Sequence, residues 1–236
     1  MTTALRVLIH GANGRMGQAL LRLAGESRDC EATAAVSREV DARVVDGIPR
    51  FAASELNGVP AFDVAIDFSQ PEGFSRVLAV CAARGKPLVS GTTGLSKSQF
   101  EALEAASIRI PVSWASNFSL GVAVLHDLVE RAARFLPGWD CDIIESHHAG
   151  KVDAPSGTAL TLGDSAGQGG ATAHYASIRA GDIVGEHVVQ FTSKGERIEL
   201  IHRAGNRDIF AAGALHVARR LHGQAAGIYR VRDLLD

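Results

Sequence analysis

A short apolar run that leads directly into a glycine loop constrains the fold of this chain most. The run Leu5–His10 ("LRVLIH") predicts a buried strand, and "GANGRMG" follows it without a break. The next residues carry apolar side chains at helical spacing, and a second apolar run, Ala32–Val36, ends at "SRE". Together these segments form a βαβ unit of about 30 residues, the size of a parallel crossover. The chain is therefore expected to begin with a parallel sheet.

Strands and helices continue to alternate as far as about residue 117. The predicted strands are "FDVAIDFS", "KPLVS" and "IRIPVSW", and the predicted helices are "PEGFSRVLAVCAARG" and "SKSQFEALEAAS". Pro71 at the start of one helix and Gly85 at its end are typical helix boundaries. The alternation predicts an α/β fold, a Rossmann-type doubly wound parallel sheet formed by residues 1–117.

The remainder of the chain has a different pattern and predicts a second domain, 118–212, of α+β type with a mixed or antiparallel sheet. Helices are expected over "SLGVAVLHDLVERAARFL" and "GTALTLGDSAG", and a strand over "CDIIESHH". "GEHVVQFTSKGERIELIHRA" predicts an antiparallel hairpin. The glycine-rich "GDSAGQGGATA" is expected to be an exposed loop. The tail, about residues 213–236, predicts a helix that could pack on either domain.

Composition excludes several classes of function. Hydrophobic residues make up 46% of the 236 residues, which is enough for a core. A net charge of -2 and 6% aromatic residues argue against nucleic-acid binding. No apolar run reaches the roughly 18 residues that a membrane helix needs. The cysteines, Cys30, Cys81 and Cys141, form no CxxC pair and indicate reduced thiols. We expect a cytoplasmic protein that contacts neither nucleic acid nor membrane.

The glycine loop is a candidate nucleotide site. Gly11, Gly14 and Gly17 lie between a strand and a helix, where glycines allow close approach of a pyrophosphate to the helix N-terminus. Glycine turns also occur for packing alone, so the loop is a weak signal without the strand before it and the helix after it.

The end of the second strand bears on the choice of nucleotide. An acidic residue there would bind the ribose hydroxyl groups, but the position holds Ser37, followed by Arg38. An arginine can pair with a 2′-phosphate, which favours NADPH over NADH. The alternative is that Arg38 is a solvated surface charge.

Two further polar loops follow strands of the first domain. "GTTG" begins at Gly91, and "WASNFSLG" follows the last strand of the alternating region. Loops at the carboxyl ends of parallel strands line the cofactor crevice of such sheets. Both could also be ordinary turns.

The stretch "ESHHAGKVDAPSGTA", residues 145–159, concentrates residues that bind anions and transfer protons. A metal site is one explanation of its histidines, but adjacent residues on a strand point to opposite faces, and no cysteine or carboxylate completes a zinc spacing. A solvated strand end is a second explanation. A third is a substrate site, in which Lys151 and a histidine lie near a helix that opens at Pro155–Ser156 and whose free amides would cradle a carboxylate.

Several motifs occur in order along nearly the whole chain: "GANGRMG", "SGTTG", "SNFSLGV", "IIESHHAGKVDAPSGTA", "VGEH" and "GERIELIHRA". In this combination the chain closely resembles the dihydrodipicolinate reductase family of diaminopimelate and lysine biosynthesis. The resemblance implies NAD(P)H-dependent reduction of 4-hydroxy-tetrahydrodipicolinate, a small dicarboxylate, to tetrahydrodipicolinate. It also implies a homotetramer and a C-terminal helix that returns to the nucleotide-binding domain.

The resemblance implies roles for individual residues. His147 matches the acid/base and Lys151 the proton donor, and which of them delivers the final proton is open. His148, Gly157 and Thr158 match residues that contact substrate. The positions that match the nucleotide-binding segments are Gly11, Ala12, Asn13, Gly14, Arg15, Met16, Gly91, Thr92, Thr93, Ala115, Ser116, Asn117 and Phe118.

The chain departs from the family pattern at Ser37, where many members carry an acidic residue, so dual use of NADH and NADPH is not transferred. Arg207 could orient substrate or serve a domain interface. Two alternatives remain: another Rossmann dehydrogenase of a small amino or keto acid, such as aspartate dehydrogenase, or a non-catalytic NADP sensor.

Overall fold

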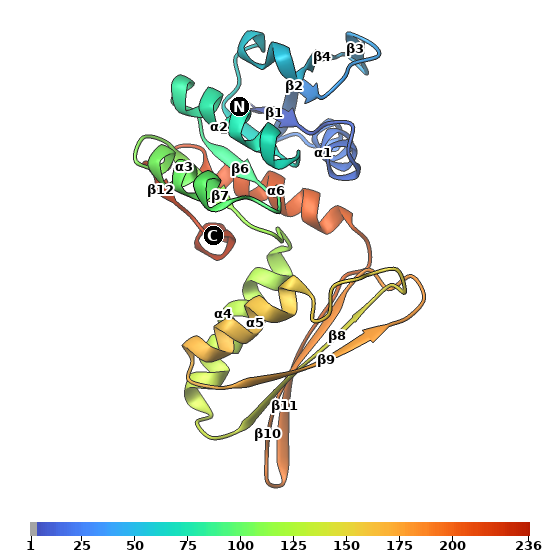
Figure 1. The fold of residues 1–236 in the computed structure, drawn as a ribbon, viewed down its shortest axis with the longest axis vertical. Helices are drawn as coiled ribbons and strands as arrows, with labels where there is room; N and C mark the ends of the chain where they lie inside the picture. Colours follow the sequence, from blue (N-terminus) through green and yellow to red (C-terminus); the bar gives the residue numbers. More distant parts are fainter. Residues whose placement is uncertain (1–3) are drawn as a thin grey trace. The chain divides into compact units, whose positions relative to one another are not determined.

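The computed structural model describes residues 4–236 and divides into two compact units (Figure 1). Unit 1 contains the chain up to Phe118 together with Phe210–Asp236, and unit 2 is Ser119–Ile209. The chain therefore leaves unit 1 once and returns to it.

Unit 1 is built on an eight-stranded sheet. The strand order is β12-β7-β6-β5-β1-β2-β4-β3, and each neighbouring pair is parallel except β3 with β4. The order reverses beside β1, as expected of a doubly wound sheet, and this confirms the predicted fold class. The strands are β1 (Leu5–His10), β2 (Cys30–Ser37), β3 (Val44–Val45), β4 (Ile48–Ala52), β5 (Val64–Asp67), β6 (Leu88–Ser90), β7 (Pro111–Trp114) and β12 (Gly227–Ile228).

The helices of unit 1 begin and end where local chemistry favours it. Ser96 caps α3 by accepting a hydrogen bond from the Gln99 amide, and Gly85 ends α2 at φ +63°. The helical elements are α1 (Arg15–Glu26), η1 (Ala53–Gly58), α2 (Pro71–Arg84), α3 (Lys97–Ser107), α6 (Asp208–Leu221) and η2 (Val231–Leu234).

The sheet of unit 1 is buried on both faces. Leu8, Ala65 and Leu88 pack on one face with residues of α2 and α3. Val7 and Ile9, which alternate with Leu8, are equally buried, and α1 contacts β1 and β2. Two covered faces explain why these strands are nearly continuous apolar runs.

The C-terminal segment belongs to unit 1. Its strand β12 extends the sheet beside β7, pairing Gly227 with Pro111. Arg219 on α6 forms an ion pair with Asp29 at 2.6 Å. The tail thus supplies both an edge strand and a helix to unit 1.

Unit 2 has two layers, a helix pair on a four-stranded sheet (Figure 1). The strand order is β11-β10-β8-β9, with β8 and β9 parallel and the other pairs antiparallel, which confirms the mixed sheet. Inward residues of β8 and β10, such as Ile143 and Phe191, form a core with α4 and α5. The elements are α4 (Leu120–Phe135), β8 (Asp140–His147), α5 (Gly157–Gln168), β9 (Ala173–Arg179), β10 (Glu186–Ser193) and β11 (Glu196–Arg203).

The expectation of an exposed glycine-rich loop was wrong for most of its length. Helix α5 continues to Gln168, and Ala166 is fully buried. A Cβ at Gly163 would meet the Tyr175 hydroxyl oxygen at 1.8 Å, and one at Gly169 would meet the Glu130 carbonyl oxygen at 2.4 Å. These glycines therefore permit close packing of α5 and the turn that follows it. The strands β3, β4, β9 and β12 were also not expected.

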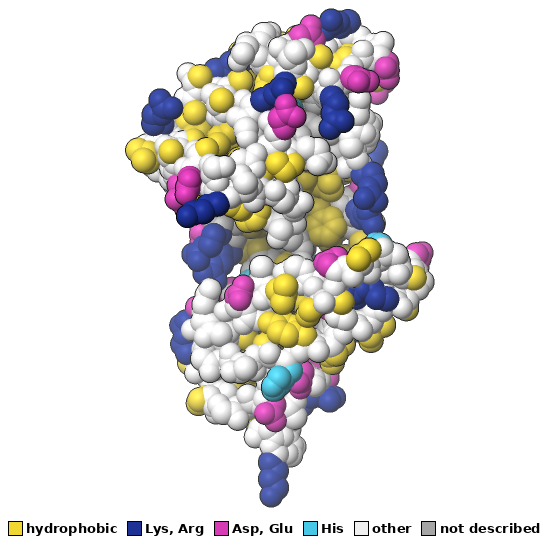
Figure 2. Space-filling model, viewed as in Figure 1, with side chains coloured by type: hydrophobic (Ala, Val, Ile, Leu, Met, Phe, Trp, Pro, Cys, Tyr) yellow, Lys and Arg dark blue, Asp and Glu magenta, His cyan; other side chains and the backbone are white. Residues whose placement is uncertain are grey.

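Figure 2 shows apolar side chains on the surface of unit 2. The exposed large apolar residues of its helices include Val124 and Leu128 on α4 and Leu160 on α5. Among residues 4–236, no helix has the length and apolar character required to cross a membrane.

Candidate functional site

The glycine loop after β1 has one open position and two crowded ones. Gly11 has φ +82°, and a Cβ there would lie 2.4 Å from the Phe68 carbonyl oxygen. A Cβ at Gly17 would lie 2.3 Å from the Gly11 carbonyl oxygen, whereas one at Gly14 would meet only that same oxygen, at 3.2 Å. Gly11 is thus required by the backbone conformation and Gly17 by the close packing of α1 on the loop. Gly14, which precedes α1, leaves the helix N-terminus accessible.

The loop opens onto a cavity of about 410 Å³ within unit 1. Of the predicted nucleotide residues, Gly11, Asn13, Gly14 and Arg38 line it, whereas Ala12 is fully buried. Sequence reasoning missed the contribution of the β5–α2 connection and of α2 itself. The lining residues are His10, Gly11, Asn13, Gly14, Ser37, Arg38, Ala53, Phe68, Ser69, Gln70, Glu72, Gly73 and Arg76.

Ser37 lines the cavity and also forms a hydrogen bond to the glycine loop. Its hydroxyl accepts a hydrogen bond from the Asn13 amide at 3.1 Å. Arg38, the next residue, is exposed at the cavity. A second arginine, Arg76, lines the same cavity and pairs with Glu72 at 2.6 Å. Ser37, the last residue of β2, and Arg38, which follows it, both line the cavity, and neither is a carboxylate.

A buried imidazole–carboxylate pair contributes to the wall of this cavity through His10. His10 Nδ1 is 2.8 Å from Asp67 Oδ1, and both side chains are almost fully buried. The hydroxyls of Ser90 and Thr92 donate to Asp67 Oδ2 at 2.8 and 2.7 Å. Burial would raise the pKa of Asp67, but hydrogen bonds from His10, Ser69 and Thr92 lower it.

The loops at Gly91 and Ala115 have structural partners in unit 1. Thr92 is buried with its hydroxyl on Asp67, and a Cβ at Gly91 would overlap the Phe68 ring at 2.1 Å. Phe118 is buried and packs edge-to-face on Phe68, with ring centroids 5.7 Å apart. The other predicted positions, Arg15, Met16, Thr93, Ala115, Ser116 and Asn117, do not line the cavity of unit 1.

In unit 2 the end of β8 carries the candidate catalytic histidine. Alternation along β8 turns Cys141, Ile143, Glu145 and His147 toward the helices. Glu145 is fully buried, and one of its oxygens, Oε2, hydrogen-bonds His147 Nδ1. The other nitrogen, Nε2, lies beside Gly185, where an added Cβ would be 3.1 Å away.

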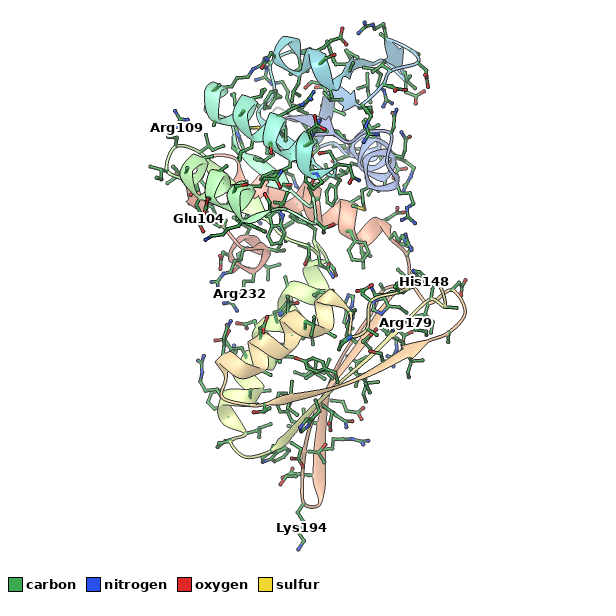
Figure 3. The ribbon with its side chains drawn as sticks, in the orientation of Figure 1. Glu104, Arg109, His148, Arg179, Lys194 and Arg232 are labelled. Atoms are coloured by element: carbon green, nitrogen blue, oxygen red, sulfur yellow. The ribbon has the colours of Figure 1, made fainter. Side chains whose placement is uncertain are left out.

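Arg179, at the end of β9, completes this group. The parallel register places Arg179 opposite His147, and Figure 3 shows Arg179 and His148 at the same end of the sheet. Its Nη1 and Nη2 donate to the two Glu145 oxygens at 2.9 and 2.7 Å. The Ser156 amide donates to Glu145 Oε1 at 3.3 Å. The carboxylate therefore has donors on both oxygens.

The pKa values follow from these contacts. Burial would raise the pKa of Glu145, but hydrogen bonds from Arg179, Ser177 and His147 lower it to about 2. Burial lowers the pKa of His147. The hydrogen bond to Glu145 and its negative charge raise this pKa, whereas the positive charges of Lys151 and Arg179 lower it further. Near neutral pH the geometry thus favours an ionised Glu145 beside a neutral His147.

Lys151 lies in the turn after β8. Its amide donates to the His148 carbonyl at 3.1 Å, and its ammonium pairs with Asp153 at 2.6 Å. The Asp153 carboxylate is 58% exposed and so is a displaceable partner. Arg179 Nη2 also donates to the Asp153 backbone carbonyl at 2.6 Å, which ties this turn to β9.

Helix α5 opens beside the same residues. Ser156 caps it by accepting from the Ala159 amide at 3.2 Å, and His187 Nε2 lies 3.2 Å from the Ser156 hydroxyl. His187 also packs edge-to-face on His147 at 5.3 Å between ring centroids. Burial, followed by the charge of His147, lowers the pKa of His187 to about 4. Gly157 is exposed and Thr158 half-buried in the first turn, where free amides can bind an anion.

The structure thus brings His147, His148, Lys151, Gly157 and Thr158 to one end of unit 2. Arg207 is exposed and has no role assigned by its surroundings. Within the described part of the chain, no group of three or more His, Cys, Asp or Glu side chains is arranged to hold a metal ion.

Sequence reasoning missed Glu145, Arg179 and His187. Glu145 had a usable signal, because residues two apart on a strand share a face and it precedes His147 by two. Arg179 and His187 had none, because their proximity to His147 depends on the order of strands in the sheet.

Comparison with known proteins identifies the family. Residues 5–118 match the family model "Dihydrodipicolinate reductase, N-terminus", and residues 121–235 match "Dihydrodipicolinate reductase, C-terminus". A 4-hydroxy-tetrahydrodipicolinate reductase of Stenotrophomonas maltophilia (strain K279a) is 71% identical, with 99% of each chain covered. The reductase of the same name from Xanthomonas axonopodis pv. citri (strain 306) is 68% identical, again over 99% of each chain.

A solved structure agrees at the level of the fold. Dipicolinate-bound dihydrodipicolinate reductase from Paenisporosarcina sp. TG-14 superposes with a TM-score of 0.80 at 22% identity, covering 96% of this chain and 97% of that one. Both halves of the chain, in sequence and in fold, therefore lead to one assignment: this chain belongs to the dihydrodipicolinate reductase family.

Proposed function

We propose that the protein reduces 4-hydroxy-tetrahydrodipicolinate to tetrahydrodipicolinate with a nicotinamide dinucleotide as the reductant. The observation that carries the proposal is the 71% identity to a reductase of that name over 99% of both chains. An NADP sensor without activity would not need an imidazole and a lysine at one strand end, and both are present in unit 2.

We propose that unit 1 binds the dinucleotide. Its cavity combines the exposed Gly14 backbone, the N-terminus of α1 and two arginines, Arg38 and Arg76. A helix N-terminus and guanidinium groups suit a pyrophosphate and a 2′-phosphate. Because Ser37 stands where a carboxylate would bind the ribose hydroxyls, NADPH is the expected substrate of choice. When bound, the nicotinamide supplies a hydride.

We propose that unit 2 binds the substrate and handles its proton. The substrate carries two carboxylates, which Lys151, His148 and the first turn of α5 at Gly157 and Thr158 can bind. Reduction of the conjugated cyclic imine, formed by loss of the 4-hydroxyl group, develops negative charge on the ring. The Lys151 ammonium, or His147 once its Nε2 has taken up a proton, can then deliver a proton to the ring.

A homotetramer in the cytoplasm completes the proposal. The sheet face of unit 2 that points away from α4 and α5 carries a row of apolar side chains, since Ile144, Val188 and Ile201 lie in register on neighbouring strands. Ile201 is 42% exposed. An exposed apolar row on a sheet is suited to contact with another copy of the chain.

The test is oxidation of NADPH and NADH at matched concentrations, with substrate generated in situ by the preceding synthase from pyruvate and aspartate semialdehyde. We expect synthase-dependent oxidation, faster with NADPH. Arg38→Ala should weaken NADPH more than NADH by about 1–3 kcal/mol if the contact is charge-assisted. Lys151→Ala should lower turnover and leave nucleotide binding intact.

The outcomes separate the alternatives. No oxidation by folded, nucleotide-binding protein would refute the reductase and favour a sensor. Oxidation that needs a different amino or keto acid would indicate another dehydrogenase. An equal effect of Arg38→Ala on both nucleotides would refute recognition of the 2′-phosphate.

A further inference from the structure

Arg179 connects three parts of unit 2 that carry the proposed chemistry. Its two terminal nitrogens bind both oxygens of Glu145, which in turn holds His147. Nη2 also binds the carbonyl of Asp153, in the turn that carries Lys151. With a side chain only 19% exposed, Arg179 is a partly buried bridge, not a surface charge.

The contacts of Glu145 determine which nitrogen of His147 carries the hydrogen. An ionised carboxylate only accepts hydrogen bonds, so the nitrogen that faces it must be the donor. That nitrogen is Nδ1. Nε2, on the opposite side of the ring beside Gly185, then carries the lone pair that a proton in transit requires.

The charge of Arg179 affects the proton affinity of His147. The charged and titratable groups around the ring are Glu145 on its own strand, Lys151 in the following turn, Arg179 on β9 and His187 on β10. A lone buried carboxylate beside an imidazole favours the imidazolium. The guanidinium balances that carboxylate, so His147 can be neutral in a buried place.

We infer that Glu145 and Arg179 are positioning residues that act through His147: they fix its hydrogen on Nδ1, and Arg179 also holds the Lys151 turn at the same strand end. The inference rests on the proposed function for its effect on rate. Its effect on the tautomer is a property of the free protein.

The experiment compares Glu145→Gln, Arg179→Met and Arg179→Lys with wild type. Arg134→Met is the matched control, because Arg134 forms an ion pair with Glu130 at 2.7 Å, the same length as the Arg179–Glu145 pair, but its side chain is 60% exposed. Readouts are the ¹⁵N shifts of the His147 ring, the pH profile of kcat/KM, kcat and KM separately, and nucleotide affinity.

Wild type and Arg134→Met should show the Nδ1–H tautomer of His147. Glu145→Gln should populate the Nε2–H tautomer and lower kcat by about 10²-fold, the lower end of what general acid–base catalysis contributes, with KM and nucleotide affinity nearly unchanged. Arg179→Met should move the His147 limb of the pH profile to higher pH, since a lowering charge is gone, and should also raise KM because the Lys151 turn is released. Arg179→Lys should recover part of each loss.

An Nε2–H tautomer in wild type would overturn the inference, as would an unmoved pH limb in folded Arg179→Met. If Arg179→Met does not fold, Arg179→Lys and the near-isosteric Glu145→Gln decide by the same measurements. Absence of synthase-dependent oxidation in wild type would refute the proposed function instead, and the ring ¹⁵N shifts would still test the tautomer.

Discussion

Both units bury a histidine against a carboxylate at the end of a strand. In unit 1 the pair is His10 with Asp67, and in unit 2 it is His147 with Glu145. In each pair Nδ1 faces the carboxylate, and the carboxylate itself is fully buried. The two pairs differ in the remaining partners of the carboxylate.

Asp67 receives neutral donors, the hydroxyls of Ser90 and Thr92 and the Ser69 amide. Glu145 receives a guanidinium on both oxygens. In unit 1 the imidazole of His10 is the titratable group that hydrogen-bonds Asp67. In unit 2 the positive charge of Arg179 balances the carboxylate of Glu145. The same pair can therefore serve to hold loops together or to prepare an imidazole for proton transfer, and the third partner decides between these roles.

The largest loss of stability is expected from a change in the His10–Asp67 pair of unit 1. Asp67→Asn should destabilise unit 1 by about 3–5 kcal/mol, because it removes the charge from a buried pair and forces an amide donor against two hydroxyl donors. Urea unfolding of a Trp139→Phe background, in which Trp114 reports on unit 1, would measure this loss.

The control for this measurement is Asp63→Asn, which breaks the more exposed ion pair with Arg6 at 2.7 Å. It should cost less than about 1 kcal/mol. Equal losses from the two variants would mean that the His10–Asp67 pair does not stabilise unit 1 as proposed.

Local patterns predicted the strand that carries His10 and the strand that carries both Glu145 and His147. The run Leu5–His10 and the alternation in "CDIIESHH" identify β1 and β8, because each element's period is visible within about eight residues. The glycine loop and the α5 opening at Ser156 were predicted for the same reason, and the structure contains both.

The contacts that these strands make with distant residues could not be predicted. His10 and Asp67 are 57 residues apart and meet only through the parallel register of β1 and β5. Arg179 ends β9, a strand that is mostly exposed and shows no apolar alternation, so neither the strand nor its last residue was recognisable. Long-range register is a property of the sheet and not of any short segment.

A smaller loss of stability should appear in unit 2 when the pH is lowered. The pKa of His187 is lowered to about 4 by burial, whereas in the unfolded chain it is near 6.5. Between these values the unfolded state binds more protons, so the stability of unit 2 should fall as pH falls from about 6.5 and level off near 4. Over this whole range, protonation of His187 in the unfolded chain should lower the free energy of unfolding by about 3 kcal/mol.

The same experiment sharpens the contrast with unit 1. The pKa of Asp67 is lowered by its hydrogen bonds, so its contribution is present above about pH 4 and is lost only below it. Urea midpoints between pH 7 and 4.5, followed by Trp139 in a Trp114→Phe background, should decline for wild type and decline less for His187→Phe. Identical declines in the two proteins would contradict the assigned role of His187.

The smallest effect concerns the exposed pair at Lys151. Asp153→Asn removes its partner charge but keeps the backbone carbonyl that Arg179 binds. Stability should change by less than about 1 kcal/mol. The freed lysine should bind the substrate carboxylate more readily, which lowers KM by about two- to fivefold, the equivalent of a surface ion pair.

Thermal unfolding and steady-state kinetics would measure both quantities for Asp153→Asn. A rise in KM would indicate that Asp153 orients Lys151 for the substrate and does not compete with it.

The return of the chain to unit 1 has a consequence for synthesis on the ribosome. Unit 2 is continuous, Ser119–Ile209, whereas unit 1 requires Phe210–Asp236, which includes α6 and the edge strand β12. Domains generally fold as units while translation proceeds. Unit 2, although translated second, is therefore the first unit whose chain is complete. Unit 1 cannot complete its sheet until β12 emerges, and the edge of β7 that pairs with β12 stays unpaired until then.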